Sequence, residues 1–154
     1  TRKADRAPLP AQTSVASEAI TAIVGDKWAQ YADAVLVIAL DKSSTSPQKA
    51  MDMLWRVAPD RNIVIVDLDV DVKNLSDVAW RALGNVDWHR DIAIHNGPVD
   101  HFAADGGAVG QIGIDATAKT DADSHPRGWP EEIFMSPEIV TLVDNKWSEY
   151  GIER

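Results

Sequence analysis

Apolar residues follow two different spacings along this chain. Residues 34–40 and 63–66 are short, unbroken and mostly β-branched apolar runs, typical of strands that are buried on both faces. Between them Ser46 and Pro47 form a helix start, with proline at the first helical position. Apolar residues then recur at helical spacing, at Ala50, Met53, Leu54 and Val57. This order predicts a parallel crossover unit whose helix packs on the sheet.

A second unit of the same kind is predicted next. A helix begins at Asn74 or Ser76 and is expected to stop at Gly84, and its apolar positions share one spacing. These positions are Leu75, Val78, Ala79 and Leu83. Residues 91–95 follow as a strand, so the pattern predicts a second crossover.

The last third of the chain alternates loops with short elements. Residues 96–109 and 118–130 are rich in glycine, proline or aspartate and are predicted to be loops, with a short strand at 112–115 between them. Pro137 opens a final helix that Gly151 is expected to stop, and its apolar stripe is Ile139, Val140, Val143 and Trp147. The whole pattern predicts an α/β fold, a three-layer α/β/α sandwich with a mainly parallel sheet of four or five strands.

The N-terminal segment differs from the rest. Residues 1–13 mix charges with two prolines and show no periodicity, as expected of a linker or disordered arm. From Ser14 apolar residues recur at helical spacing, which predicts a first helix. Residues 14–154 are therefore expected to form one domain. The chain begins at Thr1, and we expect it to be part of a longer polypeptide.

Composition excludes several classes of protein. The 154 residues are 45% hydrophobic and 25% charged, which is typical of globular domains, and the net charge of −9 disfavours nucleic acid as a partner. No cysteine is present, so disulfides, thiolate metal sites and thiol nucleophiles are absent. No apolar run approaches the length of about 18 residues that a membrane span requires, and no signal pattern precedes the domain. A cytoplasmic location without membrane contact is expected.

Three aspartates follow the second buried strand, at the sheet edge where α/β folds commonly bind ligands. They are Asp67, Asp69 and Asp71. A calcium loop of the EF-hand type would need glycine and glutamate at the positions occupied by Val72 and Val78, so that interpretation fails. The simpler interpretation is a solvated turn whose acids cap the following helix.

The same stretch also resembles the Asp-x-Asp signature of haloacid dehalogenase phosphatases. In that family the first aspartate, here Asp69, is a nucleophile, and a lysine and a distal acidic pair are needed as well. Lys119, Asp121 and Asp123 are the residues that could fill those roles. A magnesium-dependent phosphatase fragment is therefore an alternative function.

The four histidines lack the close spacing of zinc sites. They are His89, His95, His101 and His125. His95 and His101 fall near one sheet edge and could share a metal with Asp100, although scattered hydrogen-bonded histidines are the simpler interpretation.

Six tryptophans are many for this length. Trp55, Trp80 and Trp147 fall in predicted helices, where core or interface packing would account for them. Trp88, Trp129 and Trp147 lie in or near loops or the C-terminal helix and favour contact with another surface.

Four stretches in this order resemble the C-terminal domain of the UbiD family of prenylated-flavin-dependent aromatic acid decarboxylases. They are residues 63–71 leading to 78–80, residues 86–92, residues 112–117, and residues 127–133 with 147–152. The resemblance covers the chain from about residue 14 to its end.

The resemblance implies that the catalytic site and the role of this chain belong to different domains. In that family the prenylated FMN, its manganese and potassium ions and the catalytic residues belong mainly to a preceding central domain, so this chain has no catalytic residues of its own and is not expected to be active or to hold a cofactor alone. The implied role is a lid that closes over the flavin and an oligomerisation element. Its implied partners are the flavin-binding central domain and further copies of the chain.

One position departs from the family. A lysine usually precedes the 112–117 stretch and reaches toward the cofactor, and Gln111 stands there instead. Glutamine can donate a hydrogen bond but brings no positive charge, so any cofactor contact would be weaker.

The parent reaction implied by the resemblance is the non-oxidative decarboxylation of an aromatic or α,β-unsaturated carboxylic acid. A free-standing, non-catalytic protein-interaction domain is a further alternative, because a fold does not fix a function.

Overall fold

The computed structural model describes residues 17–32, 34–99, 109–124, 129 and 133–150. The chain divides into two compact units, one up to Lys119 and one from Thr120 onward. We call them the sheet unit and the C-terminal unit and describe each by itself. None of the helices in the described residues is long and apolar enough to cross a membrane.

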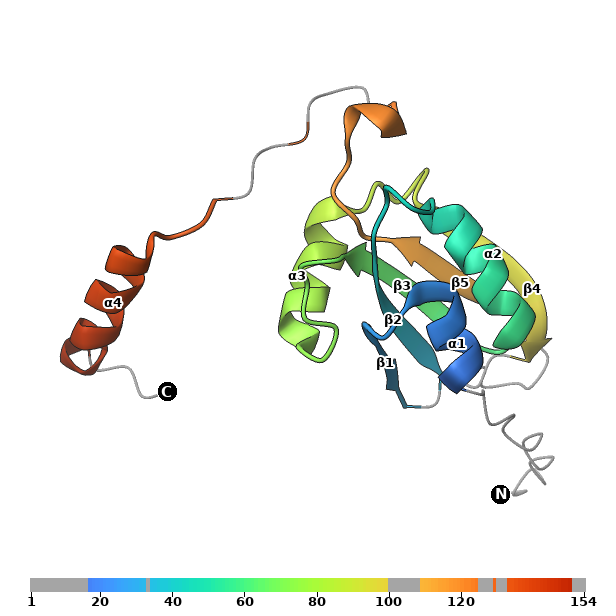
Figure 1. The fold of residues 1–154 in the computed structure, drawn as a ribbon, viewed down its shortest axis with the longest axis horizontal. Helices are drawn as coiled ribbons and strands as arrows, with labels where there is room; N and C mark the ends of the chain where they lie inside the picture. Colours follow the sequence, from blue (N-terminus) through green and yellow to red (C-terminus); the bar gives the residue numbers. More distant parts are fainter. Residues whose placement is uncertain (1–16, 33, 100–108, 125–128, 130–132, 151–154) are drawn as a thin grey trace, which may run out of the picture. The chain divides into compact units, whose positions relative to one another are not determined.

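The sheet unit is built on a five-stranded sheet with the order β1-β2-β3-β5-β4 (Figure 1). Its elements in chain order are α1 (Ser17–Val24), β1 (Trp28–Tyr31), β2 (Val35–Leu40), α2 (Pro47–Val57), β3 (Asn62–Asp67), α3 (Leu75–Asn85), β4 (Ile92–Val99) and β5 (Val109–Asp115).

The first predicted crossover is confirmed. Strands β2 and β3 are parallel and in register from Val35 opposite Asn62 to Leu40 opposite Asp67, and α2 connects them. Helix α2 begins as predicted, because the Ser46 hydroxyl accepts a hydrogen bond from the Lys49 amide at 3.4 Å and proline follows the cap.

The second predicted crossover is wrong. Strand β5, not β4, pairs in parallel with β3, while β4 takes the outer position and runs antiparallel to β5. At the opposite edge β1, which the sequence pattern did not predict, pairs antiparallel with β2. The sheet is therefore mixed and not mainly parallel. An apolar run marks a strand but carries no information on its direction.

Two boundaries also differ from the prediction. The expected loop at 96–109 begins and ends inside strands, since β4 continues to Val99 and β5 begins at Val109. Pro98 is tolerated because β4 is an edge strand, where a missing amide donor costs little. Helix α3 runs through Gly84 to Asn85, so the glycine does not stop it.

The core lies on both faces of the sheet. Leu36, Ile38 and Leu40 of β2 cluster with residues of α1 and α2, whereas Val37 and Ala39 cluster with Val78 of α3. Figure 1 shows α2 and α3 on opposite sides of the sheet. Since side chains alternate between the two faces of a strand, burial on both faces requires the unbroken apolar run seen in β2.

The C-terminal unit contains a short 3₁₀ helix η1 (Asp121–Asp123), helix α4 (Pro137–Lys146) and a 3₁₀ turn η2 (Trp147–Tyr150). Helix α4 begins as predicted at Pro137, with the Ser136 hydroxyl accepting from the Ile139 amide at 3.4 Å. None of its residues is buried. The predicted stop at Gly151 lies outside the described residues.

Candidate functional site

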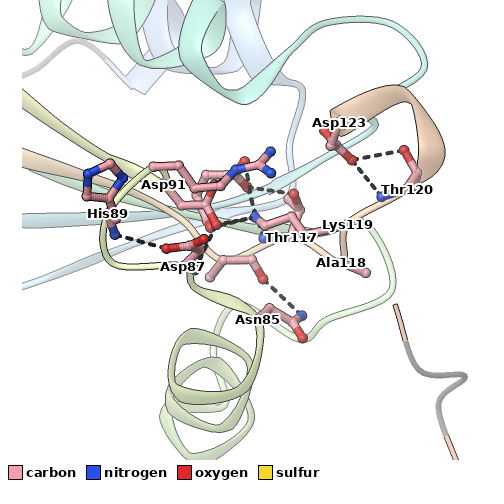
Figure 2. A network of polar contacts seen from close by, with 12 residues as sticks. Asn85, Asp87, His89, Asp91, Thr117, Ala118, Lys119, Thr120 and Asp123 are labelled. Carbon is pink, nitrogen blue, oxygen red and sulfur yellow. Dashed lines mark hydrogen bonds and ion pairs between the residues drawn. The ribbon is translucent and has the colours of Figure 1, made fainter. Parts of the chain in front are cut away.

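Polar side chains gather where the parallel strands β2, β3 and β5 end (Figure 2). The chain leaves β5 at this edge through residues 116–119, which we call the exit segment. The carboxyl ends of parallel strands are where ligand sites are expected in α/β sheets, so this edge is the candidate site.

The exit segment is held by side chains from several elements. The Ala118 amide donates to Asp67 Oδ2 at 2.8 Å, and Lys42 Nζ donates to the Ala118 carbonyl at 2.9 Å. Asn85 Nδ2, at the end of α3, donates to the Ala116 carbonyl at 3.1 Å. One amide and two carbonyls of the exit segment are therefore bonded to side chains of the sheet unit.

A buried ion-pair network centres on Lys119, whose side chain is 0% exposed. Its ammonium lies 3.0 Å from Asp91 Oδ2 and 3.4 Å from Asp115 Oδ2, and it donates to the Asp115 carbonyl at 3.0 Å. Arg90 Nε lies 3.2 Å from the other oxygen of Asp91. Two carboxylates thus face two cations. Buried charges are tolerated only when they are paired and hydrogen-bonded in this way.

Burial raises the pKa of the Asp67 carboxyl above its usual range. The hydrogen bond from the Ala118 amide opposes this shift, the nearby Asp69 adds to it, and the charges of Lys42 and Arg81 oppose it. A carboxyl with a raised pKa in the folded state favours folding when protonated, so ionised Asp67 lowers stability at neutral pH.

We therefore expect Asp67→Asn to raise the melting temperature at pH 7. The asparagine carbonyl keeps an acceptor for the Ala118 amide and removes the desolvated charge. The gain should shrink as the pH falls through the raised pKa and vanish near pH 3, below the ordinary aspartate value of about 3.9, because wild-type Asp67 is then protonated. Thermal unfolding followed by circular dichroism at both pH values measures it. A variant less stable than wild type at pH 7 would contradict this sign.

The other two aspartates of the turn make local contacts. Asp69 Oδ2 is on an exposed side chain and lies 3.6 Å from Nη2 of Arg81, whose side chain is only 14% exposed. Asp71 Oδ1 accepts from the Lys73 amide at 2.9 Å. The residue that caps α3 is Asn74, whose side chain accepts from the amides of Ser76 and Asp77, so the prediction that the aspartates cap this helix is wrong. Within the described ranges no group of three histidine, aspartate or glutamate side chains could hold a metal ion.

A groove of about 410 Å³ lies beside this turn. Its walls are residues 26–28 before and in β1 and residues 68–73 after β3. Two hydrogen bonds hold the walls together, from Lys27 Nζ to the Leu68 carbonyl at 3.1 Å and from the Tyr31 hydroxyl to the Val72 carbonyl at 2.7 Å. Three aspartates and two lysines line it, so its charges largely cancel and it does not select a strongly charged ligand.

The residues considered for an aspartyl phosphatase have other partners. Asp69 faces Arg81, and the Lys119 ammonium is bound by Asp91 and Asp115. Asp123 belongs to the C-terminal unit, where its carboxylate accepts from the amide and hydroxyl of the residue that caps η1. This arrangement gives no support to the phosphatase alternative.

The described histidines lie in different settings. The His89 amide donates to Asp87 Oδ1 at 3.0 Å, and the His95 ring stacks on Trp55 with the ring centres 4.7 Å apart. His101, His125 and Asp100 lie outside the described residues, so the suggested metal site at His95 stays a prediction.

Gln111 lies in β5 opposite His95 of β4 and is 0% exposed. A Cβ at Gly97 would come within 2.0 Å of its Oε1, so glycine is required there for the glutamine side chain to lie as it does. The residue predicted to contact a cofactor is thus packed inside the sheet unit.

The tryptophans divide between core and surface. Trp55 is buried and donates to the Arg61 carbonyl at 3.0 Å, whereas Trp80 on α3 is 75% exposed and Trp88 is also exposed. Core packing therefore accounts for Trp55, whereas for the exposed Trp80 the predicted interface packing stays a prediction.

Sequence reasoning missed the roles of Asp91, Asp115 and Lys42. A usable signal was present, because Asp91 and Asp115 are charged residues directly flanking apolar strands, where burial forces them to find partners. Their partner Lys119 is far along the chain from Asp91, and periodicity cannot show such a pair.

Comparison with known proteins gives a family. The family model described as the 3-octaprenyl-4-hydroxybenzoate carboxy-lyase C-terminal domain, UbiD_C, matches residues 11–116. An uncharacterized protein of Aquifex aeolicus is 38% identical over 97 residues, covering 61% of this chain and 20% of that protein. One of Aeropyrum pernix is 35% identical over 104 residues, covering 65% and 21%. The chain spans about a fifth of the length of these relatives.

Solved structures share the fold. The vanillic acid decarboxylase of Sedimentibacter hydroxybenzoicus in its closed form matches 88% of this chain and 31% of its own, with a TM-score of 0.64 and 19% identity. The UbiD-class enzyme HmfF from Pelotomaculum thermopropionicum, in complex with FMN, matches 83% and 31%, with a TM-score of 0.61 and 18% identity.

Proposed function

The chain belongs to the family of C-terminal domains of UbiD-type carboxy-lyases, and we propose that it is the lid and assembly domain of a prenylated-FMN-dependent decarboxylase. The observation that carries this proposal is the family match to more than half of the chain, combined with its span of about a fifth of its relatives. The proposed substrate is an aromatic or α,β-unsaturated carboxylic acid, and the proposed location is the cytoplasm.

The described residues do not fit the flavin or its metal ion. No described cluster of three acids or histidines could ligate a metal, and the cationic groups at the sheet edge are engaged, Lys42 with Ala118 and Lys119 with two carboxylates. When bound, the cofactor supplies the electron sink for decarboxylation. We therefore assign the chemistry to the region that precedes this domain in the longer relatives, and we assign no catalytic residue to this chain.

A contact between Gln111 and the cofactor remains part of the proposal. Because the side chain is 0% exposed and lies against Gly97 of β4, it could reach a ligand only if the strand pair β4–β5 rearranged. Gln111 lies near the start of β5, away from the edge where β2, β3 and β5 end, so its burial favours an indirect role through the packing of β4 on β5.

Closure as a lid is supported by a similar solved protein. The vanillic acid decarboxylase is described in a closed and an open form, and this chain matches both. An enzyme that excludes water during the reaction needs such a movement, and a domain at the end of the chain can supply it.

The assembly role is supported by exposed apolar surface on the C-terminal unit. Ile133 is 95% exposed, and Phe134, Met135, Ile139 and Leu142 are also exposed. Contiguous exposed apolar residues mark interaction surfaces, and the proposed partners are the flavin-binding region and further copies of the chain. The same surface would serve a non-catalytic interaction domain, which is the second candidate.

A fusion experiment tests the function. This chain replaces the matching segment of the Aquifex aeolicus relative, and the fusion is compared with the relative lacking that segment. Both are produced with prenylated FMN and assayed for carbon dioxide release from a panel of aromatic and α,β-unsaturated acids. Activity in the fusion and in the intact relative, but not in the truncated protein, is expected. Equal activity with and without the domain would contradict the lid role.

Trp147→Ala should lower the mass of the oligomer in light scattering while unfolding stays cooperative. Trp147 follows the exposed apolar residues of α4, and aromatic anchors at interfaces contribute about 2 kcal/mol or more each. The control is Glu138→Gln on the same helix, which should leave the mass unchanged. A monomeric wild-type chain at high concentration would refute the association, and a large fall in melting temperature at constant mass would show that Trp147 is a core residue.

A further inference from the structure

The exit segment is only four residues long, but several elements of the sheet unit hold it by hydrogen bonds. Its main-chain groups bond to Asp67 at the end of β3, to Lys42 after β2 and to Asn85 at the end of α3. The Ala116 amide also donates to the Ile65 carbonyl at 2.8 Å. Two of its four residues, Ala116 and Ala118, therefore bond to three different parts of the sheet unit.

Lys119 fixes the end of the exit segment through its side chain, by ion pairs, whereas the other contacts above are hydrogen bonds of the main chain. Its ammonium joins the Asp115 carbonyl and carboxylate, at the end of β5, to the Asp91 carboxylate just before β4 (Figure 2). The side chain points back along the segment that precedes it, so one buried cation links the end of the exit segment to the end of β5 and to the start of β4. Charge-assisted hydrogen bonds of this kind are about twice as strong as neutral ones.

The next residue along the chain, Thr120, bonds through its amide and hydroxyl within the C-terminal unit, whereas the exit segment bonds to the sheet unit. The amide and hydroxyl of Thr120 both donate to Asp123 Oδ2, at 2.7 and 2.9 Å, and this capping box lies within the C-terminal unit. The boundary between the two compact units falls at the same peptide, between Lys119 and Thr120.

We infer that Lys119 is a positioning residue, which fixes the path of the chain from the end of β5 to the boundary of the sheet unit. This inference does not depend on the decarboxylase assignment, since it rests on contacts within the chain.

The test is amide hydrogen exchange of the whole chain, resolved by residue with NMR, in wild type and in Lys119→Met. Methionine keeps the length and apolar stem of the side chain but cannot tie Asp115 to Asp91. Exchange at the hydrogen-bonded amides of Thr117 and Ala118 should rise by about tenfold or more, because the charge-assisted bonds of Lys119 that hold this segment are lost. Lys49→Met, at an exposed position on α2, is the matched control and should change nothing at these amides.

A second variant separates positioning from stability. Lys119→Met leaves the Asp91 and Asp115 carboxylates without the ammonium. Adding Asp91→Asn removes the more deeply buried of these two charges, so global stability should rise above that of Lys119→Met. The hydrogen bond from Lys119 to the Asp115 carbonyl is still missing in this variant, so amide hydrogen exchange in the exit segment should remain fast. Fast exchange confined to this segment in both variants supports the inference. Wild-type exchange there in Lys119→Met, or its recovery in the double variant together with stability, overturns it.

Discussion

Asp91→Ala should destabilise the chain by about 3 kcal/mol, because it leaves the fully buried Lys119 ammonium with one carboxylate where it had two. Breaking a buried ion pair by removing one partner typically costs about 3–5 kcal/mol, and the surviving Asp115 places this case at the lower end. The Arg90 guanidinium also loses its carboxylate, but it is partly exposed and water can replace the partner. Urea unfolding at pH 7 measures the loss.

Asp69→Ala is the matched control, since it removes the same charge from a carboxylate that is 62% exposed and leaves Arg81 with its second partner, Asp77. A carboxylate that water already reaches contributes about 0–1 kcal/mol, so this variant should unfold close to wild type. Equal losses in the two variants would show that the network around Lys119 is not the buried, paired structure described above.

Gly113→Val should lower the free energy of unfolding by about 3 kcal/mol or more, at least as much as Asp91→Ala, because there is no room for the valine side chain. A Cβ at this position in β5 would lie 2.5 Å from Met51 Sδ and 2.9 Å from Trp55 Cη2, both in buried side chains of α2. Valine adds two further methyl groups, so α2 must move away from the sheet. The melting temperature by circular dichroism measures the loss.

Gly84→Ala provides the opposite control. Nothing lies within 4 Å of a Cβ at this position inside α3, so alanine should raise stability by about 0.4–1 kcal/mol through the unfolded state. If both glycine variants destabilised the chain equally, close packing of α2 on β5 would not be the cause.

The sequence predicted the first crossover well because its signals are local. The apolar runs of β2 and β3 and the Ser46-Pro47 start of α2 each depend on neighbouring residues, and the structure agrees with them. The buried face of α2 was predicted less accurately, since Met51 and Trp55 lie in the core and Met53 is only partly buried.

Strand direction and order could not be predicted in the same way. Whether β4 or β5 lies beside β3 depends on which pairing buries more apolar surface, and this is a property of the whole sheet. Four-residue β1 escaped prediction because its sequence, Trp28 to Tyr31, is too short to establish an alternation.

The candidate site shows the same limit. The sequence offered Lys119 as a partner in a phosphatase site with Asp69, but the lysine pairs with Asp91, which is remote in sequence, and Asp69 pairs with Arg81. Residue type indicated that these groups needed partners, and only the fold showed which ones.

Flavin retention by this chain tests the central claim most directly. The chain is mixed with prenylated FMN, manganese and potassium and passed through gel filtration, while flavin absorbance is compared with protein concentration. We predict that the flavin elutes separately from the chain and that no aromatic acid is decarboxylated, because a lid domain lacks the cofactor site. A stoichiometric flavin that co-elutes with the chain would contradict the account.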